Sequence, residues 1–198
     1  MEKLNVMSLI GELQDVHGFR QRHWEGSFAD YVELVRRAPQ VARTAYQRLY
    51  DMIVSYGTTE YTHNRETLVH YSFFDDPMDD GRDAVYGLDP ALFQLVQAFE
   101  SAARRYGTEK RVLLLHGPVG SAKSTIVRLL KKGLEAYSAK EEGAIYSLSW
   151  LDLPASEGER MDCPMHEEPL HLIPQELRGP VLARLNSDLP AGQQVVLE

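Results

Sequence analysis

The residues with the clearest chemical pattern in this sequence lie in one short loop. They are Gly117, Pro118, Val119, Gly120, Ser121, Ala122, Lys123, Ser124 and Thr125. Their order fits the phosphate-loop (Walker A) pattern G-x-x-x-x-G-K-[ST] at every defined position except one, where Ala122 stands in place of the second glycine. The pattern predicts a site for the phosphates of a nucleoside triphosphate.

The residue types of this loop suit a polyphosphate. Successive backbone N–H groups of a tight turn form a concave anion site, and the following helix adds free N–H groups and the positive end of its dipole. Lys123 is expected to reach the β- and γ-phosphates, and the Ser124 hydroxyl is expected to bind the bridging Mg²⁺ ion. ATP and Mg²⁺ are therefore the predicted ligands. Ala122 costs about 1 kcal/mol if its backbone φ must be positive.

The segments on either side of the loop have the apolar patterns of a strand and a helix. Residues 112–115 form a continuous apolar run, which predicts a strand buried on both faces of a parallel sheet. Behind the loop, apolar residues recur at helical spacing. They are Ile126, Val127, Leu129, Leu130, Leu134 and Tyr137. With a second strand predicted over 143–150, this order indicates an α/β fold in which helices flank a parallel sheet.

The chain before the loop is predicted to be largely helical over its first part, residues 1–56. Ser27 is the expected N-cap of one helix, and a second is predicted from about residue 40 to 55. Asp89 is the expected N-cap of a further helix, with Pro90 at its first position.

A strand and an acidic linker are predicted between these helices. Residues 67–74 have the pattern of a short strand, and the acidic residues 75–81 predict a solvated turn or linker. We therefore expect a small helical N-terminal region with its linker over 1–83. A nucleotide-binding domain is expected over 84–198.

Composition limits the class of protein. The chain has 198 residues, of which 43% are hydrophobic and 25% charged, as in ordinary globular proteins. It has no apolar run of the roughly 20 residues that a membrane span needs, and its N-terminus lacks a signal-peptide core. The formal net charge of −8 argues against a nucleic-acid-binding protein. We expect a cytoplasmic protein that binds neither membranes nor nucleic acid.

Cys163, His166 and His171 form a second cluster of chemically active residue types. A thiolate and two imidazoles suit zinc, and a thiol near histidines could be a nucleophile. The spacing C-x₂-H-x₄-H supplies three ligands rather than the four of a closed structural site, and prolines surround it. We favour the interpretation that these side chains fix a rigid loop.

Several stretches of the sequence resemble the PrkA-type serine protein kinase family. They are residues 22–31, 71–75, 86–88, 117–125, 132–138 and 163–174, the last being the sharpest match. The resemblance implies the N-terminal AAA-type ATPase domain of a longer protein, with a P-loop NTPase sheet that is incomplete at the C-terminus. The chain departs from the family at Ser121 and Ala122, where glycines are usual, and around 151–161, where residues look inserted.

The same resemblance implies a function. The chain would be the ATP-binding segment of a bacterial serine protein kinase, a transferase of stress or starvation responses, with phosphoryl transfer carried out by other regions. Hydrolysis by AAA-type domains needs an Asp–Glu pair after a buried strand. Asp152 comes too early for this role and Glu198 is a poor candidate, so we assign no catalytic residue.

Two alternatives stay open at this point. One is an AAA-type ATPase motor for protein remodelling or proteolysis, and the other is a non-enzymatic, nucleotide-sensing assembly module. A protein substrate and a homo-oligomer are expected for the full-length protein.

Overall fold

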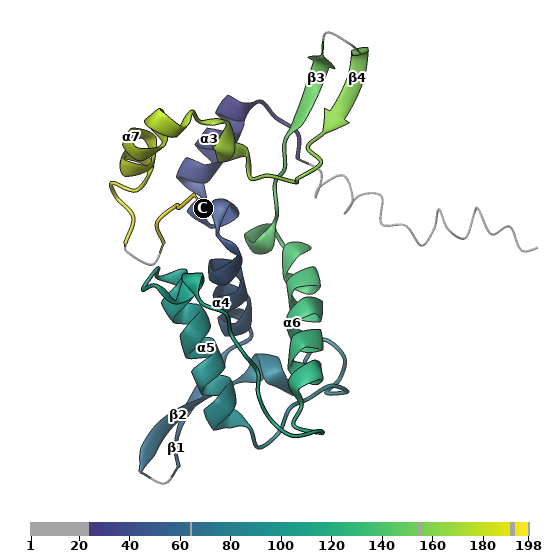
Figure 1. Cartoon of the computed structure of the whole chain (residues 1–198), viewed down its shortest axis with the longest axis vertical. Coiled ribbons are helices and arrows are strands. Elements are labelled where there is room, and N and C mark those ends of the chain that lie inside the picture. Colours follow the sequence, from purple (N-terminus) through teal and green to yellow (C-terminus); the bar gives the residue numbers. More distant parts are fainter. Residues whose placement is uncertain (1–23, 64, 154–155, 191–192, 198) are drawn as a thin grey trace, which may run out of the picture.

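The computed structural model describes residues 24–63, 65–153, 156–190 and 193–197 (Figure 1). The helices, 3₁₀ helices (η) and strands follow one another in this order: α3 (Phe28–Arg37), η1 (Pro39–Ala42), α4 (Ala45–Ser55), β1 (Thr58–His63), β2 (Glu66–Tyr71), η2 (Ser72–Asp75), α5 (Asp89–Ala103), η3 (Thr108–Lys110), α6 (Lys123–Ser138), η4 (Glu141–Gly143), β3 (Ser149–Leu153), β4 (Ser156–Asp162), η5 (Pro169–Leu172) and α7 (Gln175–Leu185). The helical prediction for residues 1–23 and the terminal Glu198 lie outside the described residues.

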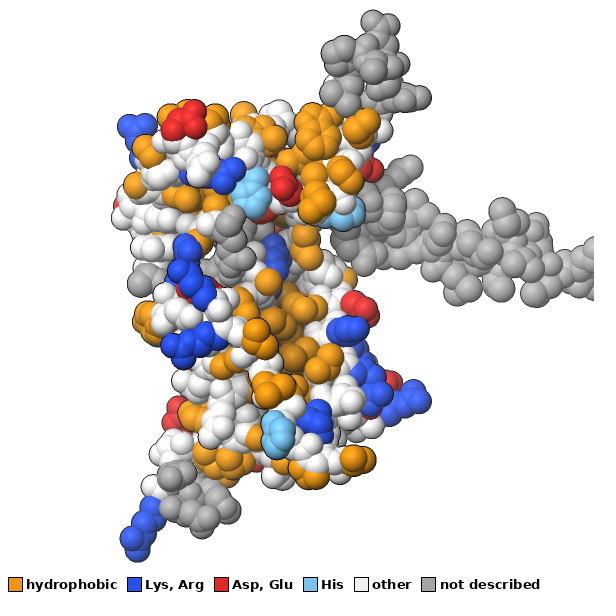
Figure 2. Space-filling model, in the orientation of Figure 1, with side chains coloured by type: hydrophobic (Ala, Val, Ile, Leu, Met, Phe, Trp, Pro, Cys, Tyr) orange, Lys and Arg blue, Asp and Glu red, His pale blue; other side chains and the backbone are white. Residues whose placement is uncertain are grey.

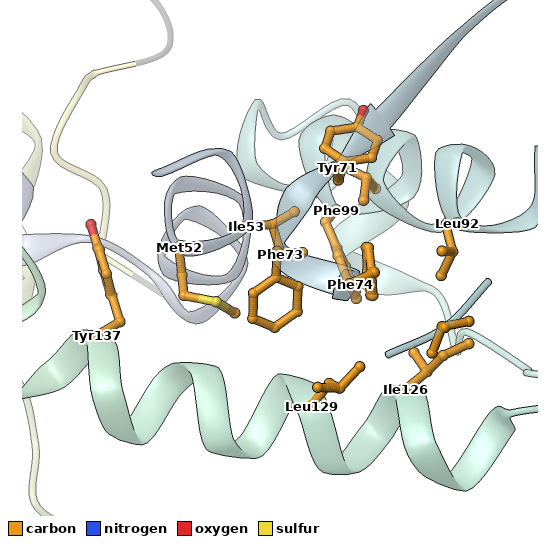
Figure 3. Close-up of a cluster of buried hydrophobic side chains, with 12 residues drawn as sticks. Met52, Ile53, Tyr71, Phe73, Phe74, Leu92, Phe99, Ile126, Leu129 and Tyr137 are labelled. Carbon is orange, nitrogen blue, oxygen red and sulfur yellow. The ribbon is translucent and has the colours of Figure 1, made fainter. Parts of the chain in front are cut away.

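Three helices, α4, α5 and α6, surround the first hydrophobic core, and the β1–β2 hairpin projects beside α5 (Figure 1). Figure 3 shows this core, in which side chains of α6 point toward the segment that follows β2. Phe73 and Phe74 from η2 are fully buried there, and so is Leu129 from α6. The apolar stripe predicted behind the loop is therefore the face on which α6 packs, except at Val127, which is 45% exposed.

A second core joins α3 to the C-terminal part of the chain. Its buried residues are Tyr31, Val35, Val41, Ala42, Leu170, Ile173 and Val195. Both cores combine residues from before and after position 83. The division of the chain into 1–83 and 84–198 stays a prediction.

Local signals place the ends of two helices. The side chain of Ser27 accepts a hydrogen bond from the backbone N–H of Asp30, whose carboxylate accepts from Ser27 in return, so the predicted N-cap of α3 is confirmed. Thr44 and Gln47 form the same reciprocal arrangement at α4. The expected cap of α5 is wrong, because Leu88 is the N-cap and makes no side-chain bond. No described helix combines the length and apolar character needed to cross a bilayer.

A mixed helix-and-strand fold is confirmed, but the predicted parallel sheet is not found in the described residues. Their strands form two antiparallel hairpins, β1–β2 and β3–β4. Residues 112–115 are not in a strand, and Val112 and Leu114 are 93% and 82% exposed. Of the strand predicted over 143–150, only Ser149 and Trp150 belong to β3. An apolar run shows that a segment needs burial, but a strand forms only where a neighbour shares its hydrogen bonds.

Candidate functional site

The loop of residues 117–122 lies at the N-terminal end of α6, remote from the β3–β4 hairpin (Figure 1). It connects the extended residues 112–116 to a helix whose first residue is Lys123. Hydrophobic side chains are exposed between the columns formed by α5 and α6 (Figure 2). Exposed hydrophobic side chains and the free N–H groups at the start of a 16-residue helix therefore both lie near the loop.

The ammonium group of Lys123 lies against the loop that precedes it. Its Nζ donates to the carbonyl oxygens of Gly117 and Pro118, at 2.9 and 2.6 Å, and to Ser121 Oγ at 2.9 Å. The Ser121 hydroxyl donates in turn to the carbonyl oxygen of Pro118 at 2.8 Å. An ammonium group has three N–H donors, so these acceptors can use all of them. A phosphate oxygen approaching Lys123 would compete with them.

Ala122 has the backbone conformation that an alanine disfavours. It is the N-cap of α6, with φ 56° and ψ 9°, and its side chain makes no capping bond. Its carbonyl oxygen accepts the first helical hydrogen bond, from the N–H of Ile126 at 2.8 Å. The backbone φ of Ala122 is therefore positive, which is the conformation that costs an alanine about 1 kcal/mol. Gly120, with φ 83°, has the same hand without a steric penalty.

The remaining loop residues are open to solvent to different degrees. Pro118, Val119, Gly120 and Ser124 are exposed, whereas Thr125 is half-buried at the start of α6. Ser124 is thus accessible to a metal ion carried by a nucleotide, as its predicted role requires.

The acidic segment after β2 holds α6 in place, which the sequence interpretation as a solvated linker missed. The carboxylate of Asp76, a fully buried residue, accepts from Lys132 Nζ at 2.8 and 3.0 Å and from the backbone N–H of Asp83 at 3.0 Å. Burial alone would raise the pKa of Asp76, but Lys132 and the Asp83 N–H hold it below its usual value. Asp83 in turn accepts from Arg128 at 2.8 and 3.0 Å. Arg128 and Lys132 lie four residues apart on one face of α6, and acidic residues precede the helix in sequence. This pattern is the sequence signal that could have predicted the ion pairs.

Gly133 explains how closely the same helix approaches η2. A Cβ at this position would lie 2.5 Å from Cε2 of Phe73 and 2.7 Å from Sδ of Met52. Only a glycine therefore allows the helix to pack at this distance. The position of α6, and of the loop at its start, depends on this contact and on the ion pairs of the acidic segment.

A cavity of about 1050 Å³ lies away from the loop, between the start of α3 and residues 144–151. Aromatic side chains line it, and the rings of Trp24 and Tyr146 meet edge to face at 5.5 Å. The hydroxyl of Tyr31 donates to Glu168 at 2.6 Å, and burial raises the pKa of both groups. This bond joins the stretches 22–31 and 163–174, two of those that carry the family resemblance.

Cys163, His166 and His171 do not form a metal centre together. Within the described residues, no group of three or more His, Cys, Asp or Glu side chains could hold a metal ion. Cys163 is buried, and its backbone N–H donates to the carbonyl oxygen of Leu148 at 2.9 Å. The carbonyl oxygen of His171 accepts from Arg178 at 3.0 Å. The backbone contacts of this loop connect it to Leu148, the residue before β3, and to α7.

Of the two acidic residues considered for hydrolysis, only Asp152 belongs to the described residues. Asp152 lies in β3, at the opposite end of α6 from Lys123 (Figure 1). Glu198 lies outside the described residues.

The sequence profile of a family described as the PrkA AAA domain matches residues 26–188. A Bacillus subtilis (strain 168) protein named ATP-dependent protease PrkA is 40% identical over 174 residues, which are 87% of this chain and 24% of that protein. A Geobacillus stearothermophilus protein, named Uncharacterized protein in gldA 5'region, is 36% identical over 108 residues, which are 54% of this chain and 100% of that protein. The chain thus spans about a quarter of the length of the Bacillus relative. No solved structure matches it.

Proposed function

This chain belongs to the PrkA AAA domain family, and we propose that it binds a Mg²⁺-loaded adenosine nucleotide through residues 117–125. The observation that carries the proposal is the position of the Lys123 ammonium group, across the loop at the start of α6. A positive charge, a turn with left-handed residues and free helical N–H groups come together there. Anions are stabilised by each of these features.

The proposed roles differ among the residues of 117–125. Lys123 would contact the β- and γ-phosphates as a point charge, and the exposed Ser124 hydroxyl would hold Mg²⁺. Gly120 and Ala122 turn the backbone so that its N–H groups can face the phosphates, and Thr125 lies in the first turn of the helix behind them. Mg²⁺, when bound, would neutralise phosphate charge and fix the phosphate geometry.

We further propose that this chain binds nucleotide without completing efficient hydrolysis by itself. The sequence offers no convincing Asp–Glu pair after a buried strand, and β3 lies remote from the loop (Figure 1). Turnover of ATP by the purified chain at about 1 s⁻¹ or faster, within the usual range of enzymes, would overturn this proposal.

The binding proposal can be tested with a fluorescent ATP analogue titrated into the purified chain with Mg²⁺. Replacing Lys123 by Ala should weaken binding at least about tenfold, because a charge-assisted contact to phosphate is lost. Lys131→Ala is the matched control, since Lys131 is an exposed lysine on the same helix. Equal affinities of Lys123→Ala and the parent chain would refute the assignment, provided that circular dichroism shows both folded.

The activity of the whole protein is a separate proposal. The family resemblance implied a serine protein kinase, whereas the Bacillus relative is named an ATP-dependent protease. That name favours the second candidate, in which this domain would couple nucleotide binding to proteolysis of a protein substrate. ATP-dependent loss of a test protein, against appearance of phosphoserine on it, separates the two in the full-length protein.

Sedimentation with and without nucleotide tests the proposed homo-oligomer.

A further inference from the structure

His70 on β2 lies between two carboxylates from other elements. Its Nδ1 is 3.0 Å from Asp89 Oδ1 at the start of α5, and its Nε2 is 2.9 Å from Asp75 Oδ2 in η2. The other Asp89 oxygen accepts from the hydroxyl of Tyr61, on β1, at 2.8 Å. The elements that meet at the ring, β1, η2 and α5, thus each contribute a titratable group.

The geometry depends on the protonation of the imidazole. A neutral ring has one N–H donor, so it can donate to only one of two carboxylates, whereas the charged ring donates to both. The hydrogen bonds to Asp75 and Asp89 raise the pKa of His70 above its ordinary value, against the opposing effect of burial. Deprotonation would leave one carboxylate facing a nitrogen lone pair.

The residues next to Asp75 in sequence contact α6. The next residue, Asp76, is fully buried and accepts from Lys132 of α6. Two residues before Asp75, the ring of Phe73 packs against Gly133 of the same helix (Figure 3). Residues 73–76 are therefore fixed to β2 on one side and to the phosphate-loop helix on the other.

We propose that His70 is a proton-operated latch, which when charged fixes residues 73–76 against β2 and α5 and thereby fixes α6 and its loop for nucleotide binding. Loss of the proton breaks the hydrogen bond to one carboxylate and weakens the contacts by which residues 73–76 hold α6. The inference rests on the proposed nucleotide site for its consequence, but the latch itself can be measured without nucleotide. His70 is a positioning residue, since it lies on β2 and not in the loop.

The direction of the pH effect follows from the raised pKa. The latch contributes its full stability below about pH 6.5, the ordinary value for histidine, and loses it as the pH rises through the pKa of the folded state. Stability and nucleotide affinity should therefore both fall on the alkaline side of pH 6.5.

The test compares the parent chain with His70→Gln and His70→Arg between pH 6 and 9. NMR titration of the His70 ring gives its pKa directly, and thermal unfolding without nucleotide reports the latch. The melting temperature of the parent should fall by about 2–4 °C relative to His70→Arg across this range, because arginine stays charged. His70→Gln should lack the parent's pH-dependent component, and the exposed His166→Gln is the control that should retain it.

Nucleotide affinity is then measured over the same range. The parent should bind the ATP analogue about fivefold more weakly at pH 9 than at pH 6. The affinities of His70→Arg and His70→Gln should change less with pH than that of the parent. An NMR pKa at or below 6.5, or equal pH profiles of melting for the parent and His70→Gln, would overturn the latch. A latch seen in melting without any nucleotide binding at either pH would overturn the proposed function and the latch's coupling to it, but not the contact itself.

Discussion

Ala122 offers a direct test of how the backbone of the loop is shaped. Its φ of 56° and ψ of 9° lie in the left-handed region, immediately before the first residue of α6. Glycine adopts this conformation without the Cβ clash that an L-residue meets there. We therefore predict that Ala122→Gly stabilises the chain, although it removes a methyl group.

The size of the effect is a difference between two terms. The left-handed conformation costs an L-residue about 1–2 kcal/mol, which glycine avoids. Glycine also gives the unfolded chain more freedom, which offsets about 0.4–1 kcal/mol of this gain. The net stabilisation should be about 0–1.6 kcal/mol, and the melting temperature of a chain of this length should rise by no more than about 3–6 °C.

Urea unfolding followed by circular dichroism measures this difference, and Ala139→Gly is the matched control. Ala139 is exposed at the other end of α6, with φ −78° and ψ −12° in the right-handed region. The same substitution should destabilise there, so the two variants have opposite signs. Ala122→Val should be less stable than the parent, because a β-branched residue is a genuine outlier at positive φ. Stability in the order Val, Ala, Gly from highest to lowest would refute the reasoning.

Two further predictions concern the contacts that hold α6 in position. Gly133→Ala should destabilise by about 1–3 kcal/mol in urea unfolding, because the new Cβ meets the ring of Phe73, and a gain from helix propensity alone would contradict this packing. Asp76→Asn should destabilise by about 1 kcal/mol or more, because Lys132 loses the buried one of its two carboxylate partners, Asp76 and Asp79, whereas the exposed Asp188→Asn should be neutral and serves as the control. An equally small effect of both asparagine variants in the same assay would show that the ion pair to α6 is unimportant.

Helix positions could be predicted from the sequence because their signals are local. The Ser27 side chain and the Asp30 carboxylate lie within one turn, so the start of α3 follows from neighbouring residues. The helix behind the loop was predicted from its apolar spacing, and α6 buries Ile126, Leu129 and Tyr137 as that spacing requires. The assignment of residues 117–125 as a phosphate loop rests on residue order and stays a prediction.

Contacts between distant residues could not be predicted in this way. The run 112–115 has the composition of a buried strand, but composition does not supply a neighbouring strand. Asp89 has the residue type of an N-cap, yet its carboxylate binds His70 and Tyr61, which lie 19 and 28 residues away in sequence. Within the acidic segment 75–81, Asp79 and Asp80 are exposed as the sequence predicts, but the burial of Asp76 depends on Lys132, which lies 56 residues further along the chain.

The loop keeps a defined shape although none of the described strands pairs with the residues before it, which indicates that its own contacts determine that shape. Lys123 binds two backbone carbonyl oxygens and one side-chain hydroxyl. The carbonyl groups belong to the turn and move only with the backbone, whereas the Ser121 hydroxyl can leave by rotation about a single bond. A phosphate oxygen would therefore displace Ser121 before it displaces Gly117 or Pro118. A glycine at position 121 would leave that ammonium N–H to solvent, so the serine gives Lys123 a third partner that can be exchanged without rebuilding the turn.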